Sequence, residues 1–527
     1  MTSRKSTEKN LANSEVKPVA SFTEENINND QVITTILSPD GKEVPVTGDV
    51  DEAMKLALHS HRELDEATDK RLLRKTDFYI MPLICFLYAC QYMDKTTNSS
   101  ASVMGLREDL NMKGDMYSWV GSSFYLGYLA FEAPVSMLLQ RFPVAKATAA
   151  FIVFWGIIMC LHATPNYAGF IFLRTMLGIA EASVTPAMVI ITGQWYKAEE
   201  QFTRTAIWFS FNGLGTIMGN LIAYGLAVHA KSYNVAAWKI LFIVVGFMTI
   251  VVGILFLILI PDSPATAWFL TEEEKMLMVE RIRGNRQGFG NKHFKMYQLK
   301  EALSDINVWI FFIFGIANDI PNGALTNFAS LLLEGNFHYS GKKSLLMQTP
   351  GGAVEVVGCT LFGLCQYLIP HRLSIAIFAT VIALVSSCML AFAMQSQNTR
   401  LAGYYLNQVS PMGMICALSC FSSNTAGHTK KIVSNALFLI GYCVGNLVGP
   451  QTFISSQAPT YTGGQISIVV CYAVSLVLLA WVYFNYYYEN KKREKKRRDF
   501  GDSFGIIENS EFADLTDKEN PNFVYRL

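Results

Sequence analysis

Gly215-Thr-Ile-Met-Gly219-Asn220-Leu221 recurs later in the chain as Gly441-Tyr-Cys-Val-Gly445-Asn446-Leu447. The two copies run in the same direction and lie 441 − 215 = 226 residues apart. Two further pairs keep this offset, namely Thr203-Arg204 with Thr429-Lys430, and Arg174 with Arg400. The chain is therefore predicted to contain two halves with the same arrangement of helices. In an apolar helix, Gly-x-x-x-Gly lets a second helix backbone approach closely, so we assign these glycines to packing.

The composition around the repeat is that of a membrane protein. Of the 527 residues 51% are hydrophobic and 16% are charged, whereas soluble domains carry roughly a quarter charged residues. Several apolar runs approach or reach the roughly 20 residues that a helix needs to cross a bilayer, over 147–162, 238–260, 374–393 and 466–488. Counting such runs and their polar breaks predicts an all-α integral membrane protein. It has about twelve transmembrane helices in two parallel six-helix halves.

The polar breaks divide the chain into five parts. We expect an N-terminal tail over 1–76, a six-helix half over 77–260, a central loop over 261–305, a second half over 306–488 and a C-terminal tail over 489–527. The first tail is polar and has no signal peptide, and we expect it to be largely disordered apart from an amphipathic stretch over 50–64.

Lysine and arginine gather in alternate loops and in the C-terminal tail. By the positive-inside rule, these loops and both termini lie in the cytosol. The basic positions are Arg141, Lys146, Lys197, Arg204, Arg372, Lys430, Lys431 and the tail cluster over 491–498. The tail cluster is interpreted as an anchor on anionic lipid. The net charge of the whole chain is only +1, which gives no reason to expect a nucleic-acid partner.

Enzyme chemistry and cofactors are not indicated by any motif. The ten cysteines fall in apolar runs, without the spacing of a disulfide framework or a metal site. Cys416 and Cys420, one helical turn apart, are interpreted as packing residues. The sequence contains no convincing nucleophile motif or phosphate-binding loop. We therefore assign no catalytic residues, no metal and no cofactor.

Ionisable residues inside apolar runs are the candidates for function, because an unpaired charge there costs several kcal/mol. The first predicted transmembrane helix contains Asp94 and Lys95, followed by Asn98 one turn after Asp94. The fourth contains Arg174 and Glu181, seven residues apart and so on one helical face. The two bases, Lys95 and Arg174, can each be interpreted in two ways. Each one either binds an anion in a central cavity or forms a structural ion pair with Asp94 or Glu181.

The second half contributes a similar group in its first helix. Asp319 lies close to the position that the repeat assigns to Asp94, and Asn318 and Asn322 flank it. Acids also occur at Glu132 in the second predicted transmembrane helix and at Glu355 in the eighth, and they are either functional or structural. We assign substrate binding to Lys95, Arg174, Asn98, Asn318 and Asn322. Proton coupling is assigned to Asp94, Glu181 and Asp319.

Loop and tail motifs extend the comparison beyond the membrane helices. The chain resembles the fungal anion:cation symporter family of the major facilitator superfamily, and within it the allantoate permease branch. The resemblance rests on Tyr92-Met-Asp94-Lys95, Met104-Gly-Leu-Arg107, Arg174-x-x-Leu-Gly-x-x-Glu181-Ala, Glu200-Gln-Phe-Thr-Arg204, Arg281-Ile-Arg283, Gln287-Gly-Phe-Gly290, Asp514-Leu-Thr-Asp517 and Glu519-Asn-Pro-Asn522. It covers nearly the whole chain from about residue 34 onward. The superfamily loop signature is degenerate, since Leu139-Gln-Arg141-Phe-Pro-Val-Ala-Lys146 lacks its glycine and acid. Gating contacts are not carried over from it.

The resemblance implies the major facilitator fold and proton-coupled import of a small organic anion. The implied substrates are allantoate, ureidosuccinate and dipeptides. The alternatives are another small carboxylate (nicotinate, pantothenate or cysteine) and a nutrient sensor built on a transporter scaffold. We expect a monomer in contact with lipid, in the plasma membrane, with the anion and protons as its other partners.

Overall fold

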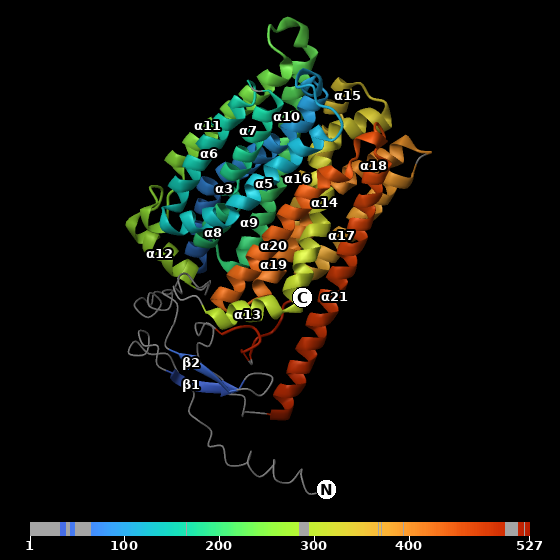
Figure 1. The fold of residues 1–527 in the computed structure, drawn as a ribbon. Coiled ribbons are helices and arrows are strands. Elements are labelled where there is room, and N and C mark those ends of the chain that lie inside the picture. Colours follow the sequence, from blue (N-terminus) through green and yellow to red (C-terminus); the bar gives the residue numbers. More distant parts are fainter. Residues whose placement is uncertain are drawn as a thin grey trace, which may run out of the picture.

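The computed structural model describes residues 32–37, 43–47, 65–283, 295–500 and 515–527, apart from positions 165, 367, 370, 394 and 521. Within these residues the chain is almost entirely helical, and the long helices run side by side in one elongated bundle (Figure 1). The elements are grouped below by the half to which they belong.

The N-terminal half contains six crossings of the bundle. Its helices are α3 (Glu66–Ser102), α5 (Met116–Arg141), α6 (Val144–Leu161), α7 (Tyr167–Glu181), α8 (Val184–Trp195), α9 (Ala198–Ser210), α10 (Asn212–Val228) and α11 (Ala237–Leu259), with the short α4 (Leu106–Asp109) after α3. Helices α7 and α8 form one interrupted crossing, and α9 and α10 form another.

The C-terminal half follows the same plan. Its helices are α14 (Ile306–Phe337), α15 (Gly341–Leu346), α16 (Thr349–Cys365), α17 (Arg372–Phe392), α18 (Gln397–Asn407), α19 (Pro411–Asn424), α20 (His428–Val448) and α21 (Thr462–Phe500). In the described residues nine crossings are long and apolar enough to span a membrane. The more polar α3 and α5, together with the α18–α19 pair, complete the predicted twelve.

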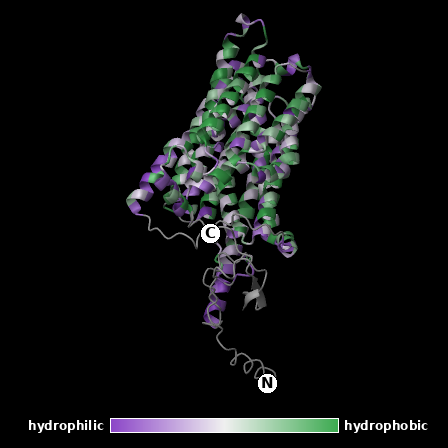
Figure 2. Ribbon diagram, turned by 90° about the vertical axis from the view of Figure 1, so that its left-hand side faces the viewer, coloured by the Kyte–Doolittle hydropathy of each residue, from purple (hydrophilic) through white to green (hydrophobic). Residues whose placement is uncertain are grey.

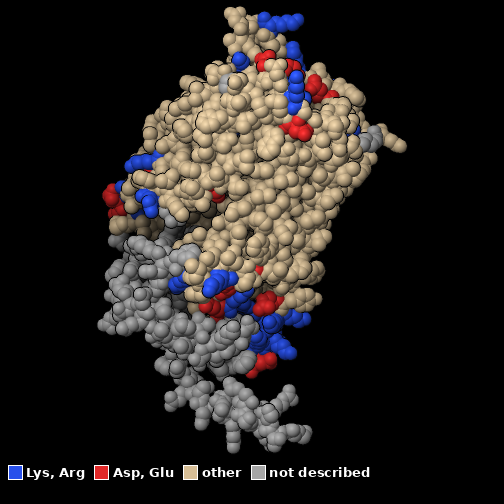
Figure 3. All heavy atoms as spheres, in the orientation of Figure 1, with Lys and Arg blue, Asp and Glu red and all other residues tan. Residues whose placement is uncertain are grey.

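An apolar belt surrounds the bundle. Large hydrophobic side chains point outward, among them Phe247 and Ile258 of α11 and Val477 of α21, which are 63%, 65% and 68% exposed. Green, hydrophobic residues cover the middle of the bundle in Figure 2, and the charged atoms of Figure 3 gather near its two ends. The apolar side chains make this surface suitable for contact with lipid. Helices can cross the lipid because their backbone hydrogen bonds are formed within the helix.

The repeated glycines hold the first helix of each half against the fifth crossing. A Cβ atom on Gly215 of α10 would lie 2.2 Å from the carbonyl oxygen of Ala89 on α3. One on Gly441 of α20 would lie 2.5 Å from the carbonyl oxygen of Phe312 on α14. Both distances are shorter than any side chain tolerates, so only glycine permits these backbone contacts.

The central loop carries two surface helices, α12 (Glu272–Arg283) and α13 (Met296–Ser304). Thr271 and Glu274 form a reciprocal cap at the start of α12. The Glu274 amide donates to Thr271 Oγ1 at 3.3 Å, and the Thr271 amide donates to Glu274 Oε2 at 3.0 Å. The end of the bundle that bears these two helices is called the central-loop face below.

Ion pairs fasten the N-terminal half at the central-loop face. Arg204 of α9 lies 2.9 Å from Asp77 of α3. Arg281 of α12 is fully buried and contacts both Asp69 on α3, at 2.7 Å, and Glu200 on α9. The central-loop helix α12 is therefore tied to the ends of two membrane helices.

A cluster around one buried cation fastens the C-terminal half at the same face. Lys430 of α20 lies 2.9 Å from Glu301 of α13, 3.1 Å from Asp305 and 2.6 Å from Asp517 in the C-terminal segment 515–527. Tyr525 in that segment donates to Asp517 Oδ2 at 2.8 Å. We call this group the Lys430 cluster. It joins the central loop, the start of α14 and the C-terminal segment.

Two short strands lie within the predicted N-terminal tail. Strands β1 (Val32–Leu37) and β2 (Glu43–Thr47) pair antiparallel, with Thr35 opposite Pro45. Both strands are rich in β-branched residues, which favour this structure. The predicted amphipathic stretch 50–64 lies outside the described residues.

Candidate functional site

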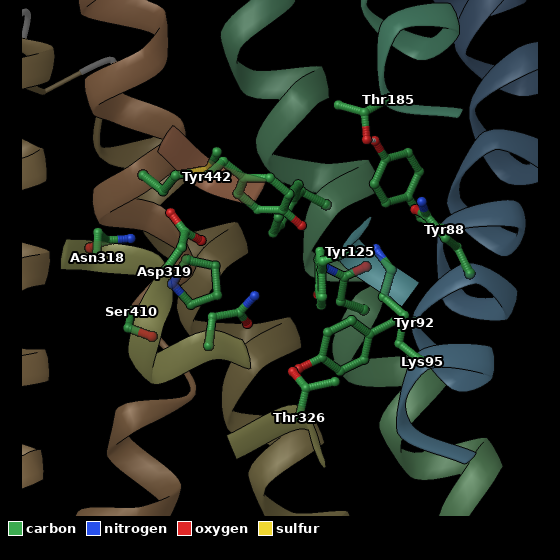
Figure 4. A pocket seen from close by; sticks show the side chains of 16 residues that line it. Tyr88, Tyr92, Lys95, Tyr125, Thr185, Asn318, Asp319, Thr326, Ser410 and Tyr442 are labelled. Atoms are coloured by element: carbon green, nitrogen blue, oxygen red, sulfur yellow. Dashed lines mark hydrogen bonds between the residues drawn. The ribbon is translucent and has the colours of Figure 1, made fainter. Parts of the chain in front are cut away.

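A polar cavity lies between the two halves, midway along the bundle. Side chains from α3, α5, α8, α9 and α10 face side chains from α14, α19 and α20 across it (Figure 4). It is lined by Tyr88, Gln91, Tyr92, Lys95, Tyr125, Thr185, Phe209, Asn212, Asn318, Asp319, Asn322, Thr326, Ser410, Pro411, Met414 and Tyr442. Four of these, Lys95, Asn318, Asp319 and Asn322, were predicted site residues.

Lys95 brings a buried positive charge into this cavity. Its Nζ atom lies 2.9 Å from Oε1 of Glu181 on α7, and the two side chains are 13% and 0% exposed. It also lies 5.8 Å from the centre of the Phe124 ring. Removing either partner of such a buried pair would leave an uncompensated charge. The structure thus pairs Lys95 with Glu181 rather than with its neighbour Asp94.

Asp94 and Arg174 lie behind the cavity wall, inside the N-terminal half. Consecutive residues of an α-helix point about 100° apart, so Asp94 and Lys95 cannot face the same space. Asp94 is 0% exposed and accepts a hydrogen bond from Thr249 of α11 at 3.1 Å. Arg174 is 2% exposed and interacts electrostatically with Glu181 and Asp94. Neither side chain lines the cavity in this structure.

The C-terminal half lines its side of the cavity with an acid and amides. Asp319 is 3% exposed and points toward Tyr442 in Figure 4. Asn322 donates to Asn446 Oδ1 at 2.8 Å, and Asn446 donates to the carbonyl of Tyr442 at 2.9 Å. These contacts position amide groups from α14 and α20 beside the cavity.

Direct contacts between α3 and α14 close the cavity away from the central-loop face. Asn98 donates to Asn327 Oδ1 at 3.3 Å, and Ser99 donates to Ser330 at 3.1 Å. Tyr117 of α5 donates to the Asn327 carbonyl at 2.7 Å. The structure therefore places Asn98, a predicted substrate contact, in the layer that separates the cavity from the opposite face.

Three tyrosines from the two halves lie close together at the cavity. The ring centre of Tyr442 on α20 lies 6.3 Å from that of Tyr125 and 6.4 Å from that of Tyr128, both on α5. Because α5 and α20 belong to different halves, these rings connect the two halves at the wall of the cavity. They were not predicted as site residues.

Sequence reasoning missed most of the aromatic and hydroxyl lining. Tyr88, Tyr92 and Tyr125 lie in apolar runs, where a tyrosine packs in a core as readily as it lines a cavity. Gln91 gave the clearest available signal, because it is an uncharged polar residue one turn before Lys95 on the same helix. Ser410 lies next to Pro411 at the break between α18 and α19, and such a break was a further signal.

Comparison with known proteins agrees with this arrangement. The model of the Major Facilitator Superfamily matches residues 84–450, which span both halves and the cavity. The chain belongs to this superfamily. It is a multi-pass membrane transporter rather than an enzyme, and the family predicted from the loop and tail motifs is confirmed.

Curated relatives match over nearly the full length. The allantoate permease of Saccharomyces cerevisiae is 48% identical over 99% of this chain and 97% of its own length. An uncharacterized transporter of Schizosaccharomyces pombe is 47% identical over 91% of this chain and 94% of its own. The thiamine pathway transporter of Saccharomyces cerevisiae is 32% identical over 86% of both chains.

Solved structures confirm the fold. A bacterial homologue of the human lysosomal transporter Spinster, in an inward-facing and occupied conformation, superposes with a TM-score of 0.56. It is 14% identical and covers 77% of this chain and 96% of its own. The unoccupied form of the Spinster homologue gives a TM-score of 0.53. The transporter studied here therefore has the superfamily fold.

Proposed function

We propose that the transporter imports a small organic anion together with protons. The observation that carries this proposal is the buried Lys95–Glu181 pair at the central cavity. A carboxylate that enters the cavity needs a fixed positive charge, and Lys95 is the cation that lines it among the described residues.

The pair offers a physical route to coupling. When a substrate carboxylate binds to Lys95, Glu181 loses its ion-pair partner and keeps only its interaction with the Arg174 charge. Its buried negative charge is then compensated less well. Such a charge costs several kcal/mol, and binding one proton removes that cost. The anion and a proton then occupy the cavity together. We infer that Asp319 on the opposite wall also takes up a proton, because its ionised form would be a buried charge.

The remaining lining suits a substrate rich in amide groups. Asn318 and Asn322 carry both donors and acceptors, and Ser410 and Thr326 add hydroxyls. A ureido group presents N–H donors and a carbonyl acceptor, which such side chains can match. The yeast relative named allantoate permease is 48% identical. We therefore take allantoate or ureidosuccinate as the first candidate, and dipeptides as the next.

The other predicted site residues do not reach the cavity as it is shaped in this structure. Asn98 and Arg174 do not line it here, and Asp94 lies behind it. Their proposed roles in substrate binding and proton coupling require the cavity to open further than in this structure. We also propose residence in the plasma membrane as a monomer contacted by lipid, with both termini in the cytosol. The basic loops support that orientation.

Uptake in yeast cells that lack their own permeases tests the function. Cells expressing the chain are expected to accumulate labelled allantoate, and a protonophore is expected to abolish the accumulation. Competition with unlabelled ureidosuccinate, nicotinate, pantothenate and cysteine ranks the alternative substrates. Cells with an empty vector, and cells expressing Lys95→Ala, serve as controls.

Two results would contradict the proposal in different ways. Accumulation that persists after the proton gradient collapses would remove proton coupling and leave anion transport intact. Binding of allantoate without any flux would instead indicate a sensor.

A further inference from the structure

A second buried acid lies beside the cavity in the C-terminal half. Glu355 of α16 is 1% exposed, and neither carboxylate oxygen has a hydrogen-bond partner among the described residues. The mechanism above does not use this side chain. A buried acid without a partner calls for an explanation, because its ionised form costs several kcal/mol.

The direction of Glu355 follows from the contacts of its helix. Gly351 and Gly358 face the turn that follows α18, where they meet Gln408 and Val409. Gly352 and Val356 face Gly213 of α10. At 100° per residue, Glu355 falls between these two contacts and points into the interior of the bundle.

Tyr92 of α3 links Glu355 to the cavity. It lines the cavity and points toward Thr326 in Figure 4, and its phenol interacts electrostatically with Glu355. The other titratable groups that interact with Glu355 are Tyr404 on α18 and Cys359 on α16. Among the described residues no charged group from a neighbouring helix is found to interact with it.

Glu355 also lies one turn from a contact between the two halves. A Cβ atom on Gly213 of α10 would lie 2.2 Å from the Gly352 carbonyl oxygen, so the two backbones touch. Transporters of this kind expose their site by rocking one half against the other. A side chain beside that contact changes its access to water as the halves move.

We propose that Glu355 is a further proton-carrying residue, beside Glu181 and Asp319, which binds a proton from cavity water on one side of the membrane and releases it on the other. This inference rests on the proposed proton-coupled import. Glu355 is neutral while buried as in this structure, and it ionises when rocking of α16 against α10 admits water past Tyr92. One proton is bound and one released in each cycle.

Purified transporter in proteoliposomes tests the role. Labelled allantoate uptake is measured under an imposed pH gradient, and exchange with internal unlabelled allantoate is measured without one. Glu355→Gln keeps the size of the neutral acid but cannot release a proton. It is expected to equilibrate allantoate without accumulating it, while exchange stays at the wild-type rate. Glu334→Gln, which removes a half-buried carboxyl of α14, is the matched control and is expected to accumulate normally.

The outcomes separate this inference from the function on which it rests. If wild type accumulates and Glu355→Gln accumulates equally, the role of Glu355 is overturned and the symport stands. If wild type transports allantoate without any response to the pH gradient, proton coupling itself is overturned, and Glu355 with it.

A second variant decides the matter if Glu355→Gln does not fold. Glu355→Asp keeps a carboxyl but draws it back from Tyr92. It is expected to accumulate allantoate with a shifted pH dependence. An unchanged pH dependence in this variant would overturn the inference.

Discussion

In the N-terminal half, Lys95 on α3 pairs with Glu181 on α7, whereas the positions 226 residues later carry Pro321 and Asn407 (95 + 226 = 321; 181 + 226 = 407). Asn407 is neutral and donates to Ser386 at 3.2 Å. The glycine contacts, by contrast, recur in both halves at the same offset. The repeat therefore preserves the packing of the helices, whereas the Lys95–Glu181 ion pair belongs to the N-terminal half alone.

The largest expected effect is at Lys95, which has no cationic counterpart across the cavity. Lys95→Ala removes the proposed anion contact and leaves Glu181 unpaired, at a cost of about 3–5 kcal/mol. We expect allantoate uptake in cells to fall by about a hundredfold or more, with a normal amount of protein at the membrane. Lys113→Ala, at an exposed site, is the control.

A double variant separates binding from structure at this pair. If Lys95 serves only to neutralise Glu181, Lys95→Ala with Glu181→Ala restores uptake to near the wild-type rate. We expect no such recovery, since the substrate anion would still lack its cation.

The next prediction compares the loss of allantoate accumulation caused by changing two acids of the N-terminal half. Glu181→Gln frees Lys95 and removes the proposed proton site, so we expect loss of uphill accumulation with some exchange retained. Asp94→Asn changes a side chain that lies behind the cavity wall, and we expect a smaller loss. Uptake and exchange in proteoliposomes measure both. Full accumulation by Glu181→Gln would refute its assignment, and a greater loss in Asp94→Asn would place the coupling acid behind the wall.

The glycines are expected to respond alike in both halves. Gly215→Ala and Gly441→Ala each force a Cβ atom against a backbone oxygen, and overpacking of this kind costs about 1–3 kcal/mol. Thermal denaturation in detergent should show comparable destabilisation of the two variants. Gly225→Ala is the matched control, because nothing lies within 4 Å of its added Cβ atom. A stable Gly441→Ala protein would show that the close packing is not equivalent.

The smallest effect concerns Asp305 in the Lys430 cluster. Burial alone would raise the pKa of the Asp305 carboxyl, but the Lys430 and Lys518 ammonium groups hold it below its ordinary value. Its stabilising effect is therefore complete above the unfolded-state pKa of about 3.9 and is lost as the pH falls through the lower folded-state value. We expect Asp305→Asn to lower stability at neutral pH by about 1 kcal/mol.

The pH dependence identifies the cause of that loss. The difference in melting temperature between wild type and Asp305→Asn should shrink below about pH 4, where wild-type Asp305 takes up a proton. A difference that stays constant with pH would mean that the carboxylate charge contributes nothing.

The fold could be predicted from the sequence because close helix packing requires glycines, which can be recognised in the sequence itself. Gly215 and Gly441 stand out in apolar runs, and their spacing alone revealed two equivalent halves. The wall of the cavity left a weaker trace. Lys95, Asn318, Asp319 and Asn322 could be selected from the sequence because polar groups are rare in membrane helices, and all four line the cavity. Their functional roles stay predictions.

Other parts of the site could not be predicted, since they depend on how separate helices rotate against one another. Nothing local distinguishes Asp94 from Lys95, yet one faces Thr249 and the other faces the cavity. Pairing of Lys95 with Glu181 joins residues 86 positions apart (181 − 95 = 86) on different helices. The tyrosines between the halves carried no charge to mark them.

The Lys430 cluster sets an order of events during synthesis. Arg204 in the N-terminal half meets Asp77, which the ribosome has already added 127 residues earlier (204 − 77 = 127). Lys430 must instead wait for Asp517, 87 residues further along the chain (517 − 430 = 87). A nascent chain interrupted before that point holds a buried ammonium group without one of its three carboxylates. The Lys430 cluster can therefore be complete only after Asp517 has been added to the chain.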